Sequence, residues 1–245
     1  MEHINKEVIC MDADQGCDDA PREPAIAAPP FLNRHEAGRA LARVLRPYEL
    51  DSDIVVIALP SGGVPIAYAV ARALHAPLGV CVVRKLGVPG HPDLAMGAIA
   101  SGDICVMNPG ILEQFRITRE VFDQVAQIQA AELRRREFAC RIGLSSIPVA
   151  GRTVIVVDDG VATGASMRAA TASMRQQGVE RIMLATPLCA QSICRALSAQ
   201  ADRIYCLRRP ESARPISESY EQFPLVTDDD VRHLLRRAAA IPLHT

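Results

Sequence analysis

Apolar and polar positions divide the chain into short apolar runs separated by stretches with helical spacing. Residues 54–59 and 154–157 are continuously apolar and rich in Val and Ile, which is typical of strands buried on both faces. After Asn33, apolar residues recur at helical spacing, and Glu36 stands three positions further on, as in a capping box. We expect strands at 54–59, 77–83, 104–107, 154–157, 181–185 and 203–207, and helices at 33–46, 64–74, 118–138, 191–197 and 228–238, with another helix ending at 177.

Strands and helices alternate along the chain from about residue 31 onward. Parallel strands need long crossover connections, and helices supply them, so this alternation predicts an α/β fold with a doubly wound, mostly parallel sheet. Residues 1–30 mix acids, alanines and four prolines without periodicity, and we expect a disordered or loosely packed extension there. The predicted domain therefore covers residues 31–240.

Composition narrows the functional classes. The 245-residue chain is 49% hydrophobic and 22% charged, with a formal net charge of −1. We therefore expect it to bind neither nucleic acid nor an acidic membrane surface. The longest uncharged run, residues 54–71, contains two prolines and two glycines and does not suit a membrane span. The first residues lack an apolar signal-peptide core, which indicates a cytoplasmic protein. The eight cysteines form no C-x-x-C pair, and we expect ordinary thiols.

The most informative segment is residues 154–166, which read VIVVDDGVATGAS. Its apolar run ends in two adjacent carboxylates, Asp158 and Asp159, and a loop with Gly, Thr and Ser then leads into a helical pattern. Backbone N–H groups at the start of a helix have no partner inside the helix and can bind an anion. An acid pair beside an anion site suits a sugar phosphate, because its hydroxyls or their metal ion can contact carboxylates.

Other phosphate-handling motifs lack a required residue here. A Walker P-loop needs Gly-Lys-Ser/Thr and a dinucleotide fingerprint needs G-x-G-x-x-G, and neither spacing follows the strand. A haloacid-dehalogenase-type phosphatase needs Asp at the position of Val157. Turn chemistry alone explains an Asp-Gly pair, but a plain turn rarely has two adjacent acids after a buried strand.

The segment resembles the phosphoribosyl-pyrophosphate (PRPP) motif of type I phosphoribosyltransferases, in which an apolar strand is followed by two acids and a Thr/Gly/Ser-rich loop. Gly160 departs from the apolar residue common after the second acid. The resemblance implies that Asp158 and Asp159 contact the ribose and, indirectly through it or through water, Mg²⁺. It also implies that the 5′-phosphate is held by Ala162, Thr163, Gly164, Ala165 and Ser166.

Two further clusters suit the pyrophosphate of PRPP. Ser61, Gly62 and Gly63 follow the first predicted strand, and glycines let backbone amides approach a phosphate closely. A plain tight turn explains these residues equally well on their own. Arg84 and Lys85 come directly after the second predicted strand, where two cations could neutralise a pyrophosphate leaving group. Because ligands bind at the carboxyl edge of open α/β sheets, we expect both clusters to meet the acid pair.

Residues 86–102 contain charges, glycines and prolines with little periodicity. We expect a long flexible loop that closes over the reacting atoms and excludes water. His91 and Asp93 lie in this stretch and are candidates for assisting proton transfer, although loop polar residues are more often solvated. Tyr220 and Phe223 are candidates for a small hood over the acceptor, and packing of the last helix explains them equally well.

Beyond the shared motif, residues 31–235 resemble a group of predicted phosphoribosyltransferases. Ser61 stands where this group usually has Arg, which we expect to weaken the pyrophosphate loop, and His91–Pro92–Asp93 replaces Asn-Pro-Glu. The blocks that carry the resemblance are FLNRHEAGRALA, LPSGGVPIAYAVARAL, APLGVCVVRKLGVPGHPDLAMGAIASG, GRTVIVVDDGVATGASMRAA and YEQFPLVTDDDVRHLL.

The resemblance implies an enzyme that transfers the phosphoribosyl group of PRPP to an acceptor such as a nitrogenous base, with release of pyrophosphate. It implies Mg²⁺ as the cofactor and, as is usual for the family, a homodimer. Two alternatives stay open, because a fold does not dictate activity: a non-catalytic regulator that binds PRPP or a nucleotide, and a phosphosugar hydrolase. The acceptor is not readable from the sequence.

Overall fold

Two sheets organise the protein, whose computed structural model describes residues 29–240 except 50, 103, 142–146 and 213. Residues 1–28 of the extension expected at residues 1–30 lie outside the described part of the structure. The central sheet is parallel, in the order β2 (Leu78–Val80), β1 (Ile54–Ala58), β6 (Thr153–Val157), β7 (Arg181–Leu188) and β8 (Arg203–Arg208). The second sheet is antiparallel and contains β3 (Val83–Val88), β4 (His91–Ala100) and β5 (Ile104–Met107).

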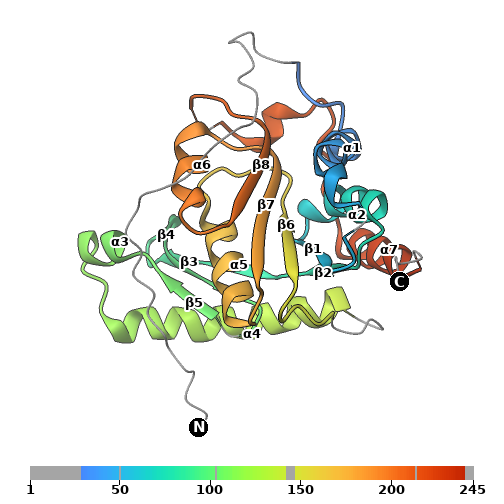
Figure 1. The fold of residues 1–245 in the computed structure, drawn as a ribbon. Coiled ribbons are helices and arrows are strands. Elements are labelled where there is room, and N and C mark those ends of the chain that lie inside the picture. Colours follow the sequence, from blue (N-terminus) through green and yellow to red (C-terminus); the bar gives the residue numbers. More distant parts are fainter. Residues whose placement is uncertain (1–28, 50, 103, 142–146, 213, 241–245) are drawn as a thin grey trace.

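Helices cover both faces of the central sheet, as Figure 1 shows. On one face lie α1 (Arg34–Leu45), α2 (Gly63–Leu74) and α7 (Asp228–Ala239), and on the other lie α5 (Ala165–Gln176) and α6 (Gln191–Ser198). In β1, Val56 belongs to the core beneath α1 and α2, and Val55 and Ile57 belong to the core beneath α5 and α6. Because both faces are buried, the strand is continuously apolar. The predicted doubly wound, mostly parallel sheet is confirmed.

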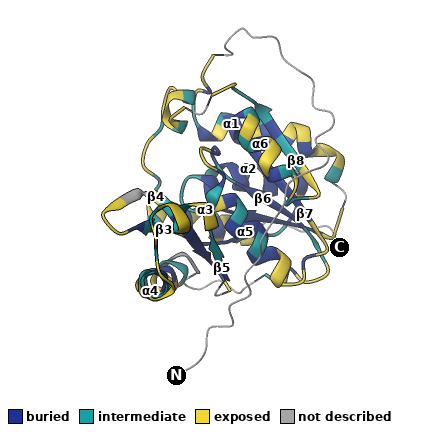
Figure 2. Cartoon of the chain, turned by 90° about the vertical axis from the view of Figure 1, so that its left-hand side faces the viewer, coloured by how far each residue is buried: buried dark blue, intermediate teal, exposed yellow. Residues whose placement is uncertain are grey.

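Local sequence signals set the helix ends. The side chain of Asn33 accepts a hydrogen bond from the Glu36 amide at 3.1 Å, and the Glu36 carboxylate accepts one from the Leu32 amide at 2.6 Å. At α7, Thr227 and Asp230 form a complete capping box. Figure 2 shows the strands of the central sheet largely buried and the exposed residues on the outer sides of the helices. In the described part of the chain, no helix has the length and apolarity to cross a membrane.

The prediction of a long loop at residues 86–102 is wrong. The segment forms the hairpin of β3 and β4, which turns at Pro89 and Gly90, and β5 pairs with its second strand. One side of this sheet packs on α4 (Arg119–Arg141), which follows the short helix α3 (Pro109–Gln114). The hairpin residues that are buried in the same cluster as Phe122 and Leu133 of α4 are Leu86, Val88, Met96 and Ile99.

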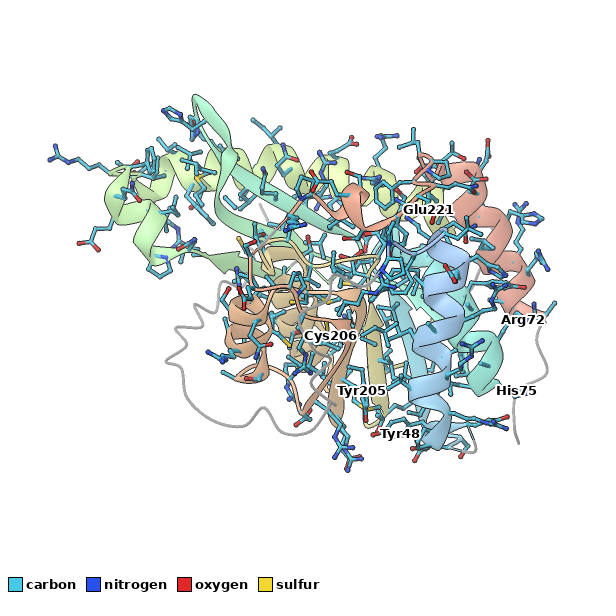
Figure 3. The ribbon with its side chains drawn as sticks, turned by 90° about the horizontal axis from the view of Figure 1, so that it is seen from above. Tyr48, Arg72, His75, Tyr205, Cys206 and Glu221 are labelled. Atoms are coloured by element: carbon cyan, nitrogen blue, oxygen red, sulfur yellow. The ribbon has the colours of Figure 1, made fainter. Side chains whose placement is uncertain are left out.

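A hood, comprising residues 29–33 and 214–227, joins the start of the described chain to the segment that precedes α7. The Phe31 amide donates to the Ser219 carbonyl at 2.9 Å, and the Glu221 amide donates to the Phe31 carbonyl at 2.8 Å. At the opposite end of the molecule, the hydroxyls of Tyr48 and Tyr205 lie 2.6 Å apart, and Figure 3 shows this pair far from Glu221. The hood therefore stands at one end of the central sheet only.

Candidate active site

The acid pair follows β6, which lies in the middle of the central sheet. Val157 pairs with Ala58 of β1 on one side and with Ala185 of β7 on the other, so the chain leaves the sheet between two neighbours. Asp158 is half-buried, and its Oδ1 accepts a hydrogen bond from the Asp159 amide at 2.9 Å. Asp159 is buried at 8% exposure. The two carboxylates therefore differ in access to a ligand.

Asp159 has two close neighbours from distant parts of the chain. Its Oδ2 accepts a hydrogen bond from Nε of Arg34 at 2.8 Å, and both side chains are about a tenth exposed. Its backbone carbonyl accepts a hydrogen bond from the Tyr220 hydroxyl at 2.6 Å. Helix α1 and the hood therefore both contact the second acid directly.

The glycine turn at the start of α2 lies against the acid pair. A Cβ atom on Gly62 would overlap a carboxylate oxygen of Asp159 and stand 2.6 Å from its Cγ. A Cβ atom on Gly63 would meet the Val157 carbonyl oxygen at 2.7 Å and Cα of Asp158 at 3.0 Å. Only glycine permits this approach. The structure thus brings Gly62 and Gly63 to the acids, as the sequence predicts, and Ser61 precedes them in the same turn.

The predicted phosphate loop leads directly into α5. Ala162, Thr163 and Ser166 are exposed, Ala165 is half-buried, and Gly164 is the buried N-cap residue with a φ of 76°. The first amides of an α-helix have no intrahelical acceptor, and the helix dipole adds about half a positive charge there. The loop is therefore placed to bind an anion one short segment away from the acids.

The structure explains why glycine stands at position 160, which the sequence alone did not reveal. A Cβ atom at this buried position would meet Cγ2 and Cγ1 of Ile216 at 2.7 and 3.0 Å. Ile216 belongs to a short 3-10 helix in the hood, at Ile216–Ser219. The side chain of Ile216 thus fills the space that an apolar residue after the second acid would need.

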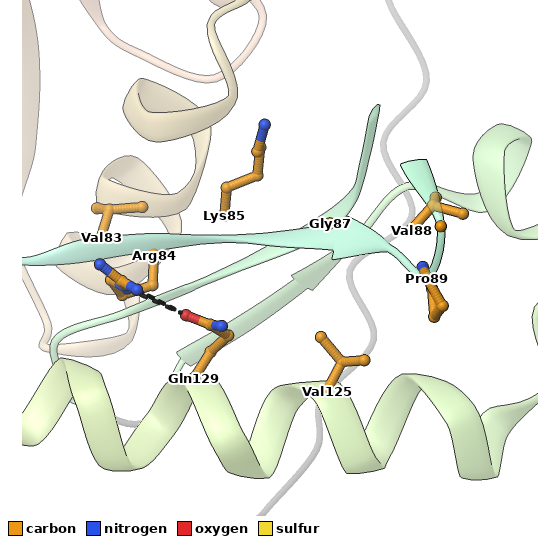
Figure 4. Close-up of a pocket in the computed structure, with 9 residues that line it drawn as sticks. Val83, Arg84, Lys85, Gly87, Val88, Pro89, Val125 and Gln129 are labelled. Atoms are coloured by element: carbon orange, nitrogen blue, oxygen red, sulfur yellow. Dashed lines mark hydrogen bonds between the residues drawn. The ribbon is translucent and has the colours of Figure 1, made fainter. Parts of the chain in front are cut away.

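The expectation that Arg84 and Lys85 directly follow a strand of the central sheet is wrong. Strand β2 ends at Val80, and both cations lie within β3 of the second sheet. Figure 4 shows Arg84 turned toward α4 and Lys85 on the opposite side of the strand. Nε and Nη2 of Arg84 donate to Oε1 of Gln129 at 3.1 and 2.9 Å.

An open groove of about 560 Å³ runs along this hairpin and α4. The Arg84 guanidinium holds the hairpin to α4 through Gln129. Lys85, the next residue in β3, points to the opposite side of the strand. The groove is lined by Val83, Arg84, Lys85, Gly87, Val88, Pro89, Gly90, Val125 and Gln129.

His91 and Asp93 both lie in β4 instead of in a loop. The exposed His91 ring is 5.6 Å from the ring of Phe115, the residue that ends α3. The side chain of Asp93 lies outside the described part of the structure. The His91 ring therefore packs near an aromatic ring. Proton transfer by His91 or Asp93 stays a prediction.

Burial and charge perturb the titration of the site. Burial raises the pKa of Asp158 well above its ordinary value, and the negative charge of Asp159 raises it further. Burial also raises the pKa of Tyr220, and the neighbouring charge of Asp159 acts in the same direction. The Tyr220 hydroxyl therefore keeps its proton and donates a hydrogen bond to the Asp159 carbonyl.

The raised pKa of Asp158 predicts a specific pH dependence of stability. An acid with a higher pKa in the folded than in the unfolded state favours folding while protonated, and this contribution is lost as the pH rises through the folded pKa. We expect the free energy of unfolding of the ligand-free protein to fall, relative to the Asp158→Asn variant, upward from about pH 4. Urea unfolding of both proteins across this range measures the difference, and parallel curves would contradict it.

A metal site built from protein side chains alone is absent from the described residues. No group of three or more His, Cys, Asp or Glu in that part of the chain is placed to hold an ion. Mg²⁺ usually keeps several waters and binds through one or two carboxylates plus substrate phosphates, so the acid pair fits it. Cys81, Cys189 and Cys206 are free thiols.

Sequence reasoning missed two arginines at this site. Arg34 contacts Asp159 although 125 positions separate them in the chain. Nη2 of Arg168 donates to the Thr163 carbonyl at 3.0 Å, and its Nη1 lies 3.0 Å from the Cβ position of Gly164. A cation near the start of a helix opposes the helix dipole, and this local signal could have pointed to Arg168 as a part of an anion site.

Fold and site together define the class of protein. The central strand of a parallel sheet ends in an acid pair, beside a glycine turn and the start of a helix, at the edge where open α/β sheets bind their ligands. Residues 32–207 match the family model described as "Phosphoribosyl transferase domain". The chain belongs to this family of transferases.

Relatives of known sequence or structure agree with this assignment. A protein of Mycobacterium tuberculosis, from strains H37Rv and CDC 1551, is named as a phosphoribosyl transferase and is 39% identical over 208 residues. The match covers 85% of this chain and 47% of that protein, so the chain spans about half the length of these curated relatives. The crystal structure of TT1426 from Thermus thermophilus is 37% identical with a TM-score of 0.73, covering 85% of this chain and 98% of that one.

Proposed function

We propose that the protein transfers the phosphoribosyl group of PRPP to a nitrogenous acceptor and releases pyrophosphate. The family supports PRPP-dependent phosphoribosyl transfer in general. The observation that carries the proposal is the direct packing of the Gly62–Gly63 turn against Asp158 and Asp159. This contact places a potential phosphate-binding turn beside a potential ribose-binding acid pair.

The donor would lie across the carboxyl ends of β1 and β6. The 5′-phosphate would bind residues 162–166 through backbone amides and the hydroxyls of Thr163 and Ser166. The ribose hydroxyls would reach the half-buried Asp158 first, with Asp159 beside it. This order follows from the loop sequence, because acids and phosphate loop are consecutive.

The pyrophosphate would bind the Gly62 amide at the start of α2, because the Gly63 amide already donates to the Leu59 carbonyl at 3.1 Å. Lys85 is proposed as the cation that reaches it, with Arg84 fixing the hairpin on α4 through Gln129. Ser61, half-buried in the same turn, offers a hydroxyl where a guanidinium would hold the leaving group more strongly. We therefore expect modest affinity for pyrophosphate.

The chemistry demands charge stabilisation at two points. As the bond from the anomeric carbon to pyrophosphate breaks, positive charge grows on the ribose and negative charge on the leaving group. The carboxylates of Asp158 and Asp159 would stabilise the ribosyl cation, and the Gly62 amide with Lys85 would stabilise pyrophosphate. Bound Mg²⁺ would neutralise part of the phosphate charge. A nitrogen of the acceptor then bonds to the anomeric carbon with inversion.

Pyrophosphate release measured with PRPP, Mg²⁺ and a panel of purine, pyrimidine and simple amine acceptors tests the activity. Release that depends on one acceptor is the expected result. Release without any acceptor would instead make the protein a phosphosugar hydrolase. Binding of PRPP without release would make it a regulator, the alternative that Ser61 in the pyrophosphate turn favours.

A further inference from the structure

Arg34, the first residue of α1, is a buried cation with three partners. Its Nε donates to Asp159 Oδ2 at 2.8 Å, and its Nη1 donates to the Pro224 carbonyl at 2.7 Å. Its guanidinium carbon lies 3.7 Å from the centre of the Phe223 ring. One side chain thus joins α1, the second acid and the hood.

The burial of this ion pair distinguishes it from surface pairs of the same protein. Arg34 and Asp159 are 10% and 11% exposed, whereas Arg175 and Asp202 are 39% and 41% exposed. A buried pair carries a desolvation cost and is retained only where its geometry is well satisfied. The hydrogen bond to Pro224 and the stacking on Phe223 supply that geometry, because they fix the plane of the guanidinium.

We propose that Arg34 is a positioning residue that sets the Asp159 carboxylate for donor binding and couples it to the hood. The proposal rests on the proposed function, in which Asp159 contacts the ribose of PRPP. Because the same guanidinium holds Phe223 and Pro224, an acceptor that shifts the hood at these residues shifts the Asp159 carboxylate as well. Donor and acceptor sides of the site are then linked through one side chain.

Arg208 provides a matched control because it makes the same two kinds of contact. Its guanidinium carbon lies 3.6 Å from the centre of the Phe31 ring, and its Nη1 donates to the Pro29 carbonyl at 2.6 Å. Loss of either arginine removes a stacked cation and a hydrogen bond to a hood carbonyl. The ion pair with Asp159 comes from Arg34.

The test measures the affinity for PRPP in the presence of Mg²⁺ by calorimetry, in full-length variants shown to be folded by circular dichroism. We expect Arg34→Gln to weaken binding at least about tenfold, the scale of one charge-assisted hydrogen bond, and Arg208→Gln to leave it within about threefold. Arg34→Lys keeps the charge but not the planar fork, so we expect it to recover only part of the loss.

A double-mutant cycle shows whether Arg34 acts through Asp159. In an Asp159→Asn background, Arg34→Gln should weaken binding by less than about threefold further, because the route of its action is already lost. Additive losses, or an Arg34→Gln protein that binds like the wild type, would overturn the inference while the proposed function stands. A wild-type protein that does not bind PRPP would overturn both.

Discussion

Replacing both acids, as Asp158→Asn with Asp159→Asn, is expected to abolish measurable binding of PRPP with Mg²⁺. Each hydrogen bond to a charged group contributes about 1.5–3 kcal/mol, so losing two weakens binding roughly hundredfold or more. The variant should fold with lower thermal stability, because Asp159→Asn leaves the Arg34 guanidinium without its ion-pair partner. Calorimetry of the folded variant measures the affinity.

The control for this double substitution is Asp123→Asn, which removes a carboxylate from a surface ion pair with Arg119. Surface pairs contribute little, so stability and affinity should both stay near the wild type. Undiminished affinity in the folded double variant would refute the assignment of Asp158 and Asp159 to the donor site.

Substituting Gly62 by Ala is the second change with a large expected effect. The added Cβ overlaps the Asp159 carboxylate, so the acid or the α2 turn has to move. A displacement of about 1 Å at a reacting site can cost about a hundredfold in rate, and we expect both PRPP affinity and pyrophosphate release to fall. Titration calorimetry and the release assay measure the two losses.

Gly110→Ala is the matched control for Gly62→Ala. A Cβ at Gly110, in α3, meets the Asn108 side-chain oxygen at an ordinary 3.8 Å, and this helix lies beside the second sheet. Affinity and activity should stay unchanged in this variant. Equal losses from both substitutions would mean that the glycines matter for general stability and that the contact with Asp159 does not.

The parts of the site that the sequence predicts are those encoded in consecutive residues. The strand at 154–157, the acids Asp158 and Asp159 and the loop at 162–166 form one strand–loop–helix unit, and each signal is local. The glycine turn before α2 was placed correctly for a similar reason, because it follows a strand that neighbours β6. Parallel strands bring their carboxyl ends to one edge, so two local motifs sufficed.

The hairpin of β3 and β4 was missed because its pattern is interrupted. Gly87, Pro89, Gly90 and Pro92 interrupt the apolar pattern of the sequence, and the register shifts on both sides of Gly87. Burial against α4, which comes later in the chain, then decides the structure. With the hairpin in place, Arg84 and Lys85 point to opposite sides of one strand instead of sharing an edge.

Long-range contacts were beyond sequence reasoning altogether. The hood joins residues 29–33 to residues 214–227, and it brings Tyr220 to the Asp159 backbone and Ile216 to Gly160. No local sequence pattern predicts these contacts. The same holds for Arg34, which reads as an ordinary first-turn helix residue until the structure shows its partner across the chain.

Binding of PRPP to the wild-type protein, with and without Mg²⁺, tests the central claim most directly. Calorimetry should show saturable binding that depends on Mg²⁺, and thermal unfolding should shift upward, since a ligand at a hundred times its Kd stabilises the folded state by about 2.7 kcal/mol. Neither heat of binding nor thermal protection at millimolar PRPP with Mg²⁺ would contradict a PRPP site at Asp158 and Asp159.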